Sequence, residues 1–263
     1  MASSNKNAAF PVYDKTKKNV VFVLYDKVTL VDFVGATEVF NNVFVNNKPL
    51  YNIHWLAPGL APITTSENMR VLPTGTFTEP VPGLKTLKNI DILFVPGGNW
   101  EGIANCMTDK AYMQFITNTA KHATWTGSVC TGAFLLAATG ELTKCLATTY
   151  WSQLNNLSLM AAKYNFTVVP GYPRFLLDDA RKRFTGGGIS SSLDLALKLT
   201  EQLYGKAVAE KAQLFIQYAP GPSVSAGDPA EAPPVISAEV QAMQTGYTGG
   251  FQQFLQGFLK GKK

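Results

Sequence analysis

The distribution of apolar positions along the chain predicts an alternation of buried strands and amphipathic helices. Short continuous apolar runs over residues 19–24 and 90–95 are typical of parallel strands that are covered on both faces. A longer segment over residues 31–44 has apolar residues three or four positions apart and predicts a covering helix. We therefore expect an α/β fold with a mostly parallel sheet between helical layers.

The rest of the chain continues this pattern. Ser152 is a candidate N-cap for a helix that follows it, and Gly140 is a candidate C-cap. The segment 220–234 is rich in Pro, Gly, Ser and Ala, which favours an extended surface loop. The further expected strands are 51–56, 123–126, 166–169, 174–177 and 183–185, and the further expected helices are 109–121, 134–138, 191–203, 205–218 and 240–259.

Composition fits a single soluble domain, because 263 residues that are 46% apolar can bury one large core. The net charge of +5 comes partly from lysines near the two ends, and these are not interleaved with aromatic residues, so nucleic acid is not an expected partner. The first ten residues lack the apolar stretch of a secretory signal, and no apolar run reaches membrane-spanning length. We expect a cytoplasmic protein without a membrane partner.

A cysteine occupies a tight turn between a predicted strand and a predicted helix, in the segment Ser-Val-Cys-Thr-Gly-Ala of residues 128–133. This is the layout of a nucleophile elbow, which holds its side chain over the carboxyl edge of a sheet. The free N–H groups of a helix N-terminus lower the pKa of a cysteine and favour the thiolate. Cys130 is therefore the candidate nucleophile, and the alternative is a small buried core residue.

The other cysteines and the histidines limit which reactions the candidate nucleophile can perform. Three cysteines form an odd set without metal-type spacing, which speaks against a disulfide framework or a metal site. The residue after Cys130 is Thr131 rather than a histidine. His122 lies at the far end of the strand that leads into the elbow, roughly 20 Å away at ~3.3 Å per residue. His54 lies within a predicted strand, so proteolysis and glutamine hydrolysis, which pair the cysteine with an imidazole, are disfavoured.

Two further segments carry candidate chemistry. Asp32 stands just before an apolar periodic run, where it is either a functional carboxyl or an ordinary helix N-cap. The turn Pro96-Gly97-Gly98 ends a buried strand, and its glycines either make a simple turn or let the backbone approach a ligand closely.

Taken together, these segments resemble the isonitrile (isocyanide) hydratase branch of the class I glutamine amidotransferase-like superfamily, which also contains the Parkinson-associated glyoxalase/deglycase and an intracellular protease. The resemblance extends from residue 20 to about residue 240. It rests on residues 30–35 (LVDFVG), 96–98 (PGG), 128–132 (SVCTG), 147–151 (ATTYW), 185–189 (TGGGI) and 217–222 (QYAPGP).

The resemblance implies a flavodoxin-like three-layer sandwich, a homodimer, no cofactor and no metal, and the hydration of an isocyanide to an N-substituted formamide. In domain terms it implies a flexible N-terminal extension over residues 1–18, the α/β domain over residues 19–240 and a C-terminal helical tail over residues 241–263.

The terminal carbon of an isocyanide accepts a soft nucleophile and also needs a proton. We expect Cys130 to attack this carbon and to give a thioimidate that water hydrolyses, with Asp32 as the proton donor. This role requires burial to raise the pKa of Asp32. A backbone N–H of Gly97 or Gly98, together with that of Thr131, is expected to face the nucleophile and to stabilise developing charge.

The substrate pocket is expected to involve Trp151 and Gly187. An aromatic residue such as Trp151 can line an apolar pocket or belong to the core, and the glycines of residues 186–188 can pack against the site or only separate a strand from a helix.

Three alternatives remain open at this point. A glyoxalase or deglycase acting on methylglyoxal uses the same elbow, although it prefers Glu to the Asp found at position 32. A redox sensor would oxidise the thiol without turning over a substrate. A ligand-sensing domain of a transcription regulator would need two helix-turn-helix units, for which we expect no room after Tyr218.

Overall fold

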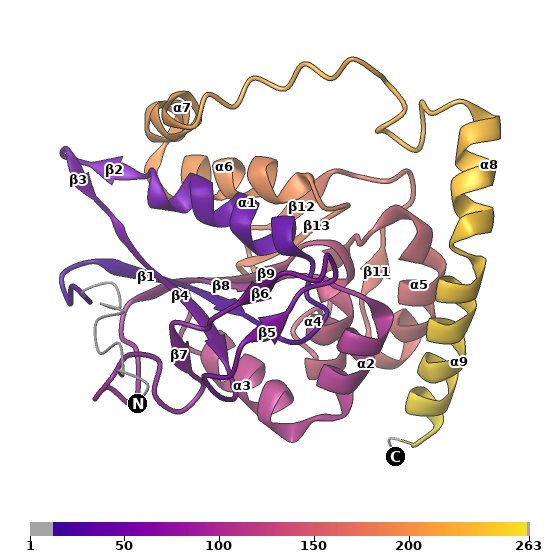
Figure 1. Ribbon diagram of the computed structural model, residues 1–263, viewed down its shortest axis with the longest axis horizontal. Coiled ribbons are helices and arrows are strands. Elements are labelled where there is room, and N and C mark those ends of the chain that lie inside the picture. Colours follow the sequence, from indigo (N-terminus) through magenta and orange to yellow (C-terminus); the bar gives the residue numbers. More distant parts are fainter. Residues whose placement is uncertain (1–12, 262–263) are drawn as a thin grey trace, which may run out of the picture.

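A seven-stranded sheet crosses the part of the chain that the computed structural model describes, residues 13–261 (Figure 1). Neighbouring strands are parallel except for the antiparallel pair at one edge. The order across the sheet is β12 (Phe175–Asp178), β13 (Arg183–Gly186), β9 (Trp125–Ser128), β8 (Ile90–Val95), β1 (Lys18–Val23), β4 (Tyr51–Ala57) and β7 (Gly75–Thr76).

Continuous apolar sequence accounts for the central strands. All six residues of β8 are buried, as are five of the six in β1, so these strands are covered on both faces. Isolated apolar runs of this kind are stable only between two layers, and the layers are present. The predicted strands 19–24 and 90–95 are confirmed to within one residue at either end.

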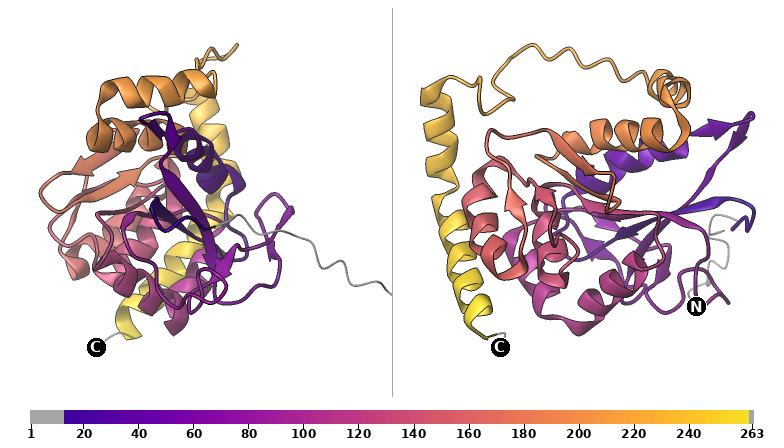
Figure 2. Two further views of the ribbon diagram at one scale, coloured as in Figure 1. Left: turned by 90° about the vertical axis from the view of Figure 1, so that its left-hand side faces the viewer. Right: turned by 180° about the vertical axis from the view of Figure 1, so that it is seen from behind.

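Helices cover both faces of the sheet, which confirms the predicted three-layer α/β fold (Figures 1 and 2). On one face, α1 (Leu30–Asn41) packs against α6 (Ser191–Tyr204), and α7 (Lys206–Phe215) packs on α6. The opposite layer contains α2 (Trp100–Thr108), α3 (Lys110–Ala120), α4 (Ala133–Thr139) and, packed on α4, α5 (Leu154–Tyr164).

Three pairs of short strands lie outside the main sheet, within the described residues. Between β2 (Phe44–Val45) and β3 (Lys48–Pro49), Asn46 and Asn47 have φ values of 51° and 60°, which a two-residue hairpin turn requires and asparagine tolerates. The other short pairs are β5 (Ile63–Thr64) with β6 (Arg70–Val71), and β10 (Leu146–Ala147) with β11 (Thr167–Val168).

Two expected helix boundaries were wrong, and one helix was missed. Helix α1 ends at Asn41 instead of residue 44, because the β2–β3 hairpin begins there. The helix expected over residues 109–121 is confirmed as α3, which Asp109 caps by accepting the N–H of Ala111 at 2.7 Å, but α2 before it was not predicted. Ser152 does not cap a helix, since a 3₁₀ turn over Trp151–Gln153 precedes α5.

The C-terminal segment forms two helices, α8 (Pro234–Met243) and α9 (Thr245–Gly261). The predicted helix 240–259 therefore starts too late, and the domain boundary expected at residue 240 falls within α8. Helix α9 packs against α5 and α2, and Phe251 and Leu255 on it are fully buried. It is thus joined to the core instead of forming a separate tail.

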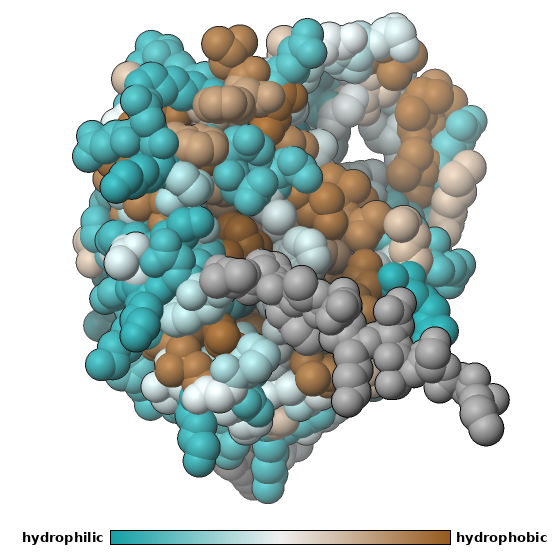
Figure 3. Space-filling view, turned by 60° about the vertical axis from the view of Figure 1, so that its left-hand side comes forward, coloured by the Kyte–Doolittle hydropathy of each residue, from teal (hydrophilic) through white to brown (hydrophobic). Residues whose placement is uncertain are grey.

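Residues 219–233 connect the two sides of the molecule from α7 to α8. This connection arches over the body, as the view from behind makes plain (Figure 2), and residues 219–228 are all exposed. The space-filling view shows an opening at its upper right, between the body and the C-terminal side (Figure 3). The extended surface loop predicted for residues 220–234 is confirmed.

Most of the expected N-terminal extension, residues 1–12, lies outside the described residues. The described remainder is anchored at Asp14, whose N–H donates to Asn52 Oδ1 at 3.2 Å, and β1 begins at Lys18. Among residues 13–261, no helix has both the length and the apolar character needed to cross a bilayer.

Candidate active site

Cys130 lies in a strained turn between β9 and α4, at the carboxyl edge of the sheet. Its φ is 55°, in the left-handed region, and its side chain is 5% exposed. Two hydrogen bonds hold the turn: the Cys130 N–H donates to the Gly187 carbonyl at 2.8 Å, and the Thr149 hydroxyl donates to the Cys130 carbonyl at 2.7 Å. A non-glycine residue in this conformation costs about 1–3 kcal/mol, which such bonds offset. The turn has the geometry of a nucleophile elbow.

Asp32 reaches the same place from the first turn of α1. The start of α1 is tied to the turn that follows β8, because the Thr29 N–H donates to the Gly97 carbonyl at 2.9 Å. The Gly97 N–H in turn donates to Oδ2 of Asp32 at 2.7 Å. Oδ1 of Asp32 has no hydrogen-bond partner within the described residues, although Asp32 is completely buried. The carboxyl is therefore fixed on one side and free on the other.

Gly97 is the point around which the three candidate catalytic residues meet. A Cβ atom at Gly97 would lie 2.6 Å from the Thr131 nitrogen and 2.8 Å from both Asp32 Oδ2 and Cys130 Cβ. Real Cβ atoms do not approach other atoms so closely, so only glycine fits here. Because Gly97 has no side chain, Cys130, the Asp32 carboxyl and the Thr131 backbone can all pack directly against it.

The N–H groups of the glycines have partners other than the nucleophile, contrary to what the sequence led us to expect. The Gly97 N–H binds Asp32, and the Gly98 N–H donates to the Thr131 hydroxyl at 2.9 Å. The same hydroxyl donates to the Gly98 carbonyl at 2.8 Å. Of the expected donors, Thr131 is the one that acts on Cys130, since its hydrogen bonds lower the pKa of the thiol.

Burial raises the pKa of Asp32 to about 8, and the negative charge of Glu67 adds to this rise. The hydrogen bond from the Gly97 N–H and the neighbouring Cys130 thiol act in the opposite direction. A helix N-terminus favours a carboxylate by only about 0.3–1 kcal/mol, whereas full burial shifts a carboxyl by up to several pH units. Burial wins, and Asp32 holds its proton at neutral pH.

Burial likewise raises the pKa of the Cys130 thiol well above its usual range, and the adjacent Asp32 raises it further. The hydrogen bonds from Thr131 do not outweigh this effect. The expectation that the helix N-terminus favours a thiolate was therefore wrong for the resting site, because the sulfur is almost completely desolvated. Cys130 and Asp32 form a neutral, protonated pair.

The two expected pocket residues lie in different settings. Gly187 is buried behind the elbow, where its carbonyl accepts the Cys130 N–H. Trp151 is half-buried, and its ring packs edge-on against Tyr150 and Tyr172, with ring centroids 6.1 and 6.4 Å apart. Gly187 thus supports the nucleophile directly, whereas Trp151 belongs to a neighbouring aromatic group.

Three residues near the pair were missed by sequence reasoning. The Tyr25 hydroxyl donates to the Pro96 carbonyl at 2.8 Å, Glu67 accepts the N–H of Leu30 at the start of α1, and the Tyr247 hydroxyl donates to the Gly98 carbonyl at 3.1 Å. No motif marks them. For Tyr247 the available signal is Gly250, which lets α9 approach Trp100 closely.

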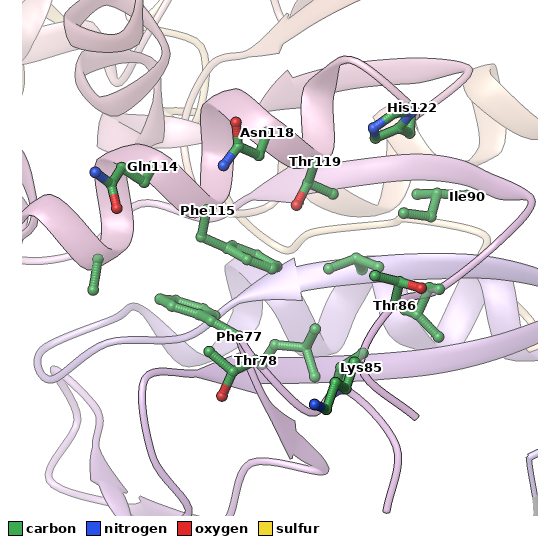
Figure 4. A pocket seen from close by; sticks show the side chains of 15 residues that line it. Phe77, Thr78, Lys85, Thr86, Ile90, Gln114, Phe115, Asn118, Thr119 and His122 are labelled. Carbon is green, nitrogen blue, oxygen red and sulfur yellow. The ribbon is translucent and has the colours of Figure 1, made fainter. Parts of the chain in front are cut away.

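The histidines lie away from the elbow. Burial lowers the pKa of His54 to about 4, and its Nε2 lies 2.8 Å from Asn19 Oδ1. His122 lines a cavity of about 430 Å³ between α3 and the β7 side of the sheet, where Phe77 and Phe115 stack at 4.1 Å (Figure 4). A second cavity of about 400 Å³ is lined by His54 and Trp55. Cys130 lines neither cavity.

Within residues 13–261, the His, Cys, Asp and Glu side chains do not form a group of three or more that could hold a metal ion. The three cysteines are free thiols.

Comparisons with known proteins place this geometry in a family. Isonitrile hydratase of Pseudomonas putida is 33% identical over 221 residues, which are 84% of this chain and 87% of that enzyme. The HTH-type transcriptional regulator GbdR of Pseudomonas aeruginosa is 26% identical over 209 residues, which are 78% of this chain and 52% of the regulator.

Solved structures agree with this placement. A THiJ/PfpI family protein of Pseudomonas syringae has a TM-score of 0.77 and 25% identity, with 96% of this chain and 99% of that one covered. DJ-1beta of Drosophila melanogaster shares the fold, with a TM-score of 0.63 at 17% identity over 78% of this chain and 100% of its own. Residues 18–202 match the model of the DJ-1/PfpI family. The chain with the buried Cys130–Asp32 pair belongs to the DJ-1/PfpI family.

Proposed function

We propose that this protein hydrates an isocyanide to an N-substituted formamide, with Cys130 as the nucleophile and Asp32 as the acid and base. The observation that carries the proposal is the neutral pair itself. A carboxyl that keeps its proton at neutral pH stands beside a thiol, with one oxygen bound to Gly97 and the other free. Such a pair can deliver a proton and a sulfur to the same atom.

The first step adds the S–H group across the isocyanide carbon. Asp32 gives its proton to the carbon while the sulfur of Cys130 bonds to it, and the proton of the thiol passes to the carboxylate. The product is a thioimidate, R–N=CH–S–Cys130, and Asp32 is again protonated. The reaction needs no external acid, and no net charge has to be buried.

The second step adds water to the thioimidate carbon. Asp32 gives its proton to the thioimidate nitrogen and accepts one from the water as the C–O bond forms, which leaves R–NH–CH(OH)–S–Cys130. As the C–S bond breaks, the hydroxyl proton passes by way of Asp32 to the sulfur. The products are R–NH–CHO and the free thiol. Thr131 supports the sulfur as it leaves, since its hydrogen bonds favour the charged form of Cys130.

The identity to isonitrile hydratase of Pseudomonas putida supports this assignment over the other readings. The protonated thiol speaks against a redox sensor, because oxidation by peroxide proceeds through the thiolate. The resemblance to the transcriptional regulator GbdR leaves a regulatory role on the same scaffold as the alternative, but such a role gives no reason for a protonated carboxyl beside a thiol.

The test is formamide production from cyclohexyl isocyanide by the purified protein. We expect turnover in the wild type and a loss of at least about 100-fold in Cys130→Ala and in Asp32→Asn, as for removal of a nucleophile or a general acid. Cys145→Ala is the matched control, because it removes a buried thiol from β10–β11 and is expected to retain wild-type activity.

Absence of formamide in the wild type would contradict the proposal. Consumption of methylglyoxal in its place would move the protein to the glyoxalase branch. Full activity of Asp32→Asn would show that the carboxyl has no part in proton transfer.

A further inference from the structure

We propose that Tyr247 on α9 is a positioning residue for the Cys130–Asp32 pair, so that the C-terminal helix is a working part of the active site. This inference deepens the proposed function and rests on it for its activity measurement. The geometry that carries it is a hydrogen-bonded path from the Tyr247 hydroxyl to the carboxyl and the thiol.

The path begins at the Gly98 carbonyl. This carbonyl accepts the Tyr247 hydroxyl at 3.1 Å and the Thr131 hydroxyl at 2.8 Å. The Gly98 N–H donates to the Thr131 hydroxyl oxygen at 2.9 Å. One residue earlier, the Gly97 N–H holds Asp32 at 2.7 Å. A bond at the Gly98 carbonyl therefore fixes the turn that holds Asp32 and Thr131, and Thr131 acts directly on Cys130.

Hydrogen bonds hold helix α9 in place next to Tyr247. Thr248 receives hydrogen bonds from Gln153 and Asn156, at 3.2 Å to its hydroxyl and 3.1 Å to its carbonyl. Just before it, the Gln244 amide donates to the Tyr150 hydroxyl at 2.8 Å. These contacts leave the Tyr247 hydroxyl little freedom, as a positioning group requires.

Several charged and titratable groups face the pair. Tyr25 lies under the turn and Glu67 lies at the start of α1, while Tyr247 and Glu101 lie on the side of α9 and α2. Burial raises the pKa of Tyr247 far above its usual range, and Cys130 and Glu101 raise it further, whereas the Trp100 N–H lowers it. Tyr247 is therefore a neutral hydroxyl throughout the working pH range, and its effect on the pair is exerted through hydrogen bonds.

Removal of this hydroxyl has a defined consequence for the pair. The hydrogen bond from Gly97 lowers the pKa of Asp32, and those from Thr131 lower the pKa of Cys130. If the turn loosens, the hydrogen bonds from Gly97 and Thr131 weaken, so the pKa values of Asp32 and Cys130 rise. The alkaline limb of activity, where Asp32 loses its proton, then moves to higher pH.

The experiment compares Tyr247→Phe with the wild type. We expect kcat for cyclohexyl isocyanide to fall about three- to tenfold, the effect of one lost hydrogen bond, while KM changes less than about twofold. The alkaline limb is expected to move up by about half a pH unit. Alkylation of Cys130 by iodoacetamide, followed against pH by mass spectrometry, is expected to show the same upward movement.

Tyr204→Phe is the matched control. It also removes a part-buried hydroxyl, one that donates to Asp91 at the amino end of β8, and it is expected to leave the pH dependence of alkylation unchanged. A Tyr247→Phe protein with the wild-type kcat and pH profile would overturn the proposal, even if its melting temperature fell. If the wild type hydrates no isocyanide, the proposed function fails, and the alkylation profile alone decides whether Tyr247 acts on the pair.

Discussion

Asp32 owes its chemical character to burial, which raises the pKa of its carboxyl. Its pKa of about 8 means that the folded protein keeps a proton that the unfolded chain releases near pH 4. Between these values the folded state binds more protons than the unfolded state, so stability falls as pH rises from about 4 to about 8. A neutral amide at this position does not titrate and can still accept the Gly97 N–H.

We therefore expect Asp32→Asn to gain stability relative to the wild type as pH rises. The difference in free energy of unfolding between the two proteins should grow by about 2–4 kcal/mol from pH 5 to pH 8, at about 1.4 kcal/mol per pH unit. Urea unfolding at both pH values measures it. Parallel pH dependence of the two proteins would show that Asp32 is ionised in the folded state.

At the residue scale, the strand-to-helix turn was enough to single out Cys130, whereas Asp32 and Thr131 were selected with the help of the resemblance to a known family. The structure brings all three together around Gly97. The protonation of the thiol was not predictable, since it depends on how completely distant segments exclude water from the sulfur. Tyr247 was missed for the same reason: it reaches the site from the far end of the chain.

At the scale of the element, the elbow stores strain. Cys130 has a φ of 55°, and its turn is held by Gly187 and Thr149. Glycine adopts this conformation without a steric cost, whereas alanine does not.

Two substitutions that both remove the sulfur should therefore differ in stability. We expect Cys130→Gly to be more stable than Cys130→Ala by about 1 kcal/mol, as measured by urea unfolding. The same pair at Cys145, whose φ is not positive, should show the opposite order, because glycine there only adds freedom to the unfolded chain. Equal stabilities at position 130 would mean that the turn relaxes without the sulfur.

Element prediction succeeded where burial of apolar residues decides the structure. The buried strands are continuous apolar runs, and no other environment suits them. The break between α2 and α3 depends on the side-chain cap of Asp109, and the start of α5 depends on a 3₁₀ turn at Trp151, so neither follows from apolar periodicity.

At the scale of the whole molecule, α9 reaches the candidate active site from the C-terminal side of the chain. Phe251 on α9 is fully buried and meets Phe134 on α4 edge-on, with ring centroids 4.6 Å apart. Helix α4, which follows Cys130, is therefore packed between the sheet and α9. The homodimer implied by the resemblance and the cytoplasmic location expected from the sequence remain predictions.

Truncation of this contact should weaken the whole fold. We expect Phe251→Ala to lower the free energy of unfolding by about 3–5 kcal/mol, because it leaves a large cavity in a packed interface. Phe254→Ala, which removes a half-buried ring one turn away, is expected to cost less. Urea unfolding measures both, and equal losses would show that α9 is not anchored through Phe251.

The exposed connection over residues 219–233 has one more consequence. Because it is the covalent link between α7 and the C-terminal helices and is exposed along residues 219–228, a cut within it leaves α9 held by its buried apolar face. A separately supplied peptide of residues 234–261 would bind the remaining body as a ligand does, and catalysis would become a function of the peptide concentration.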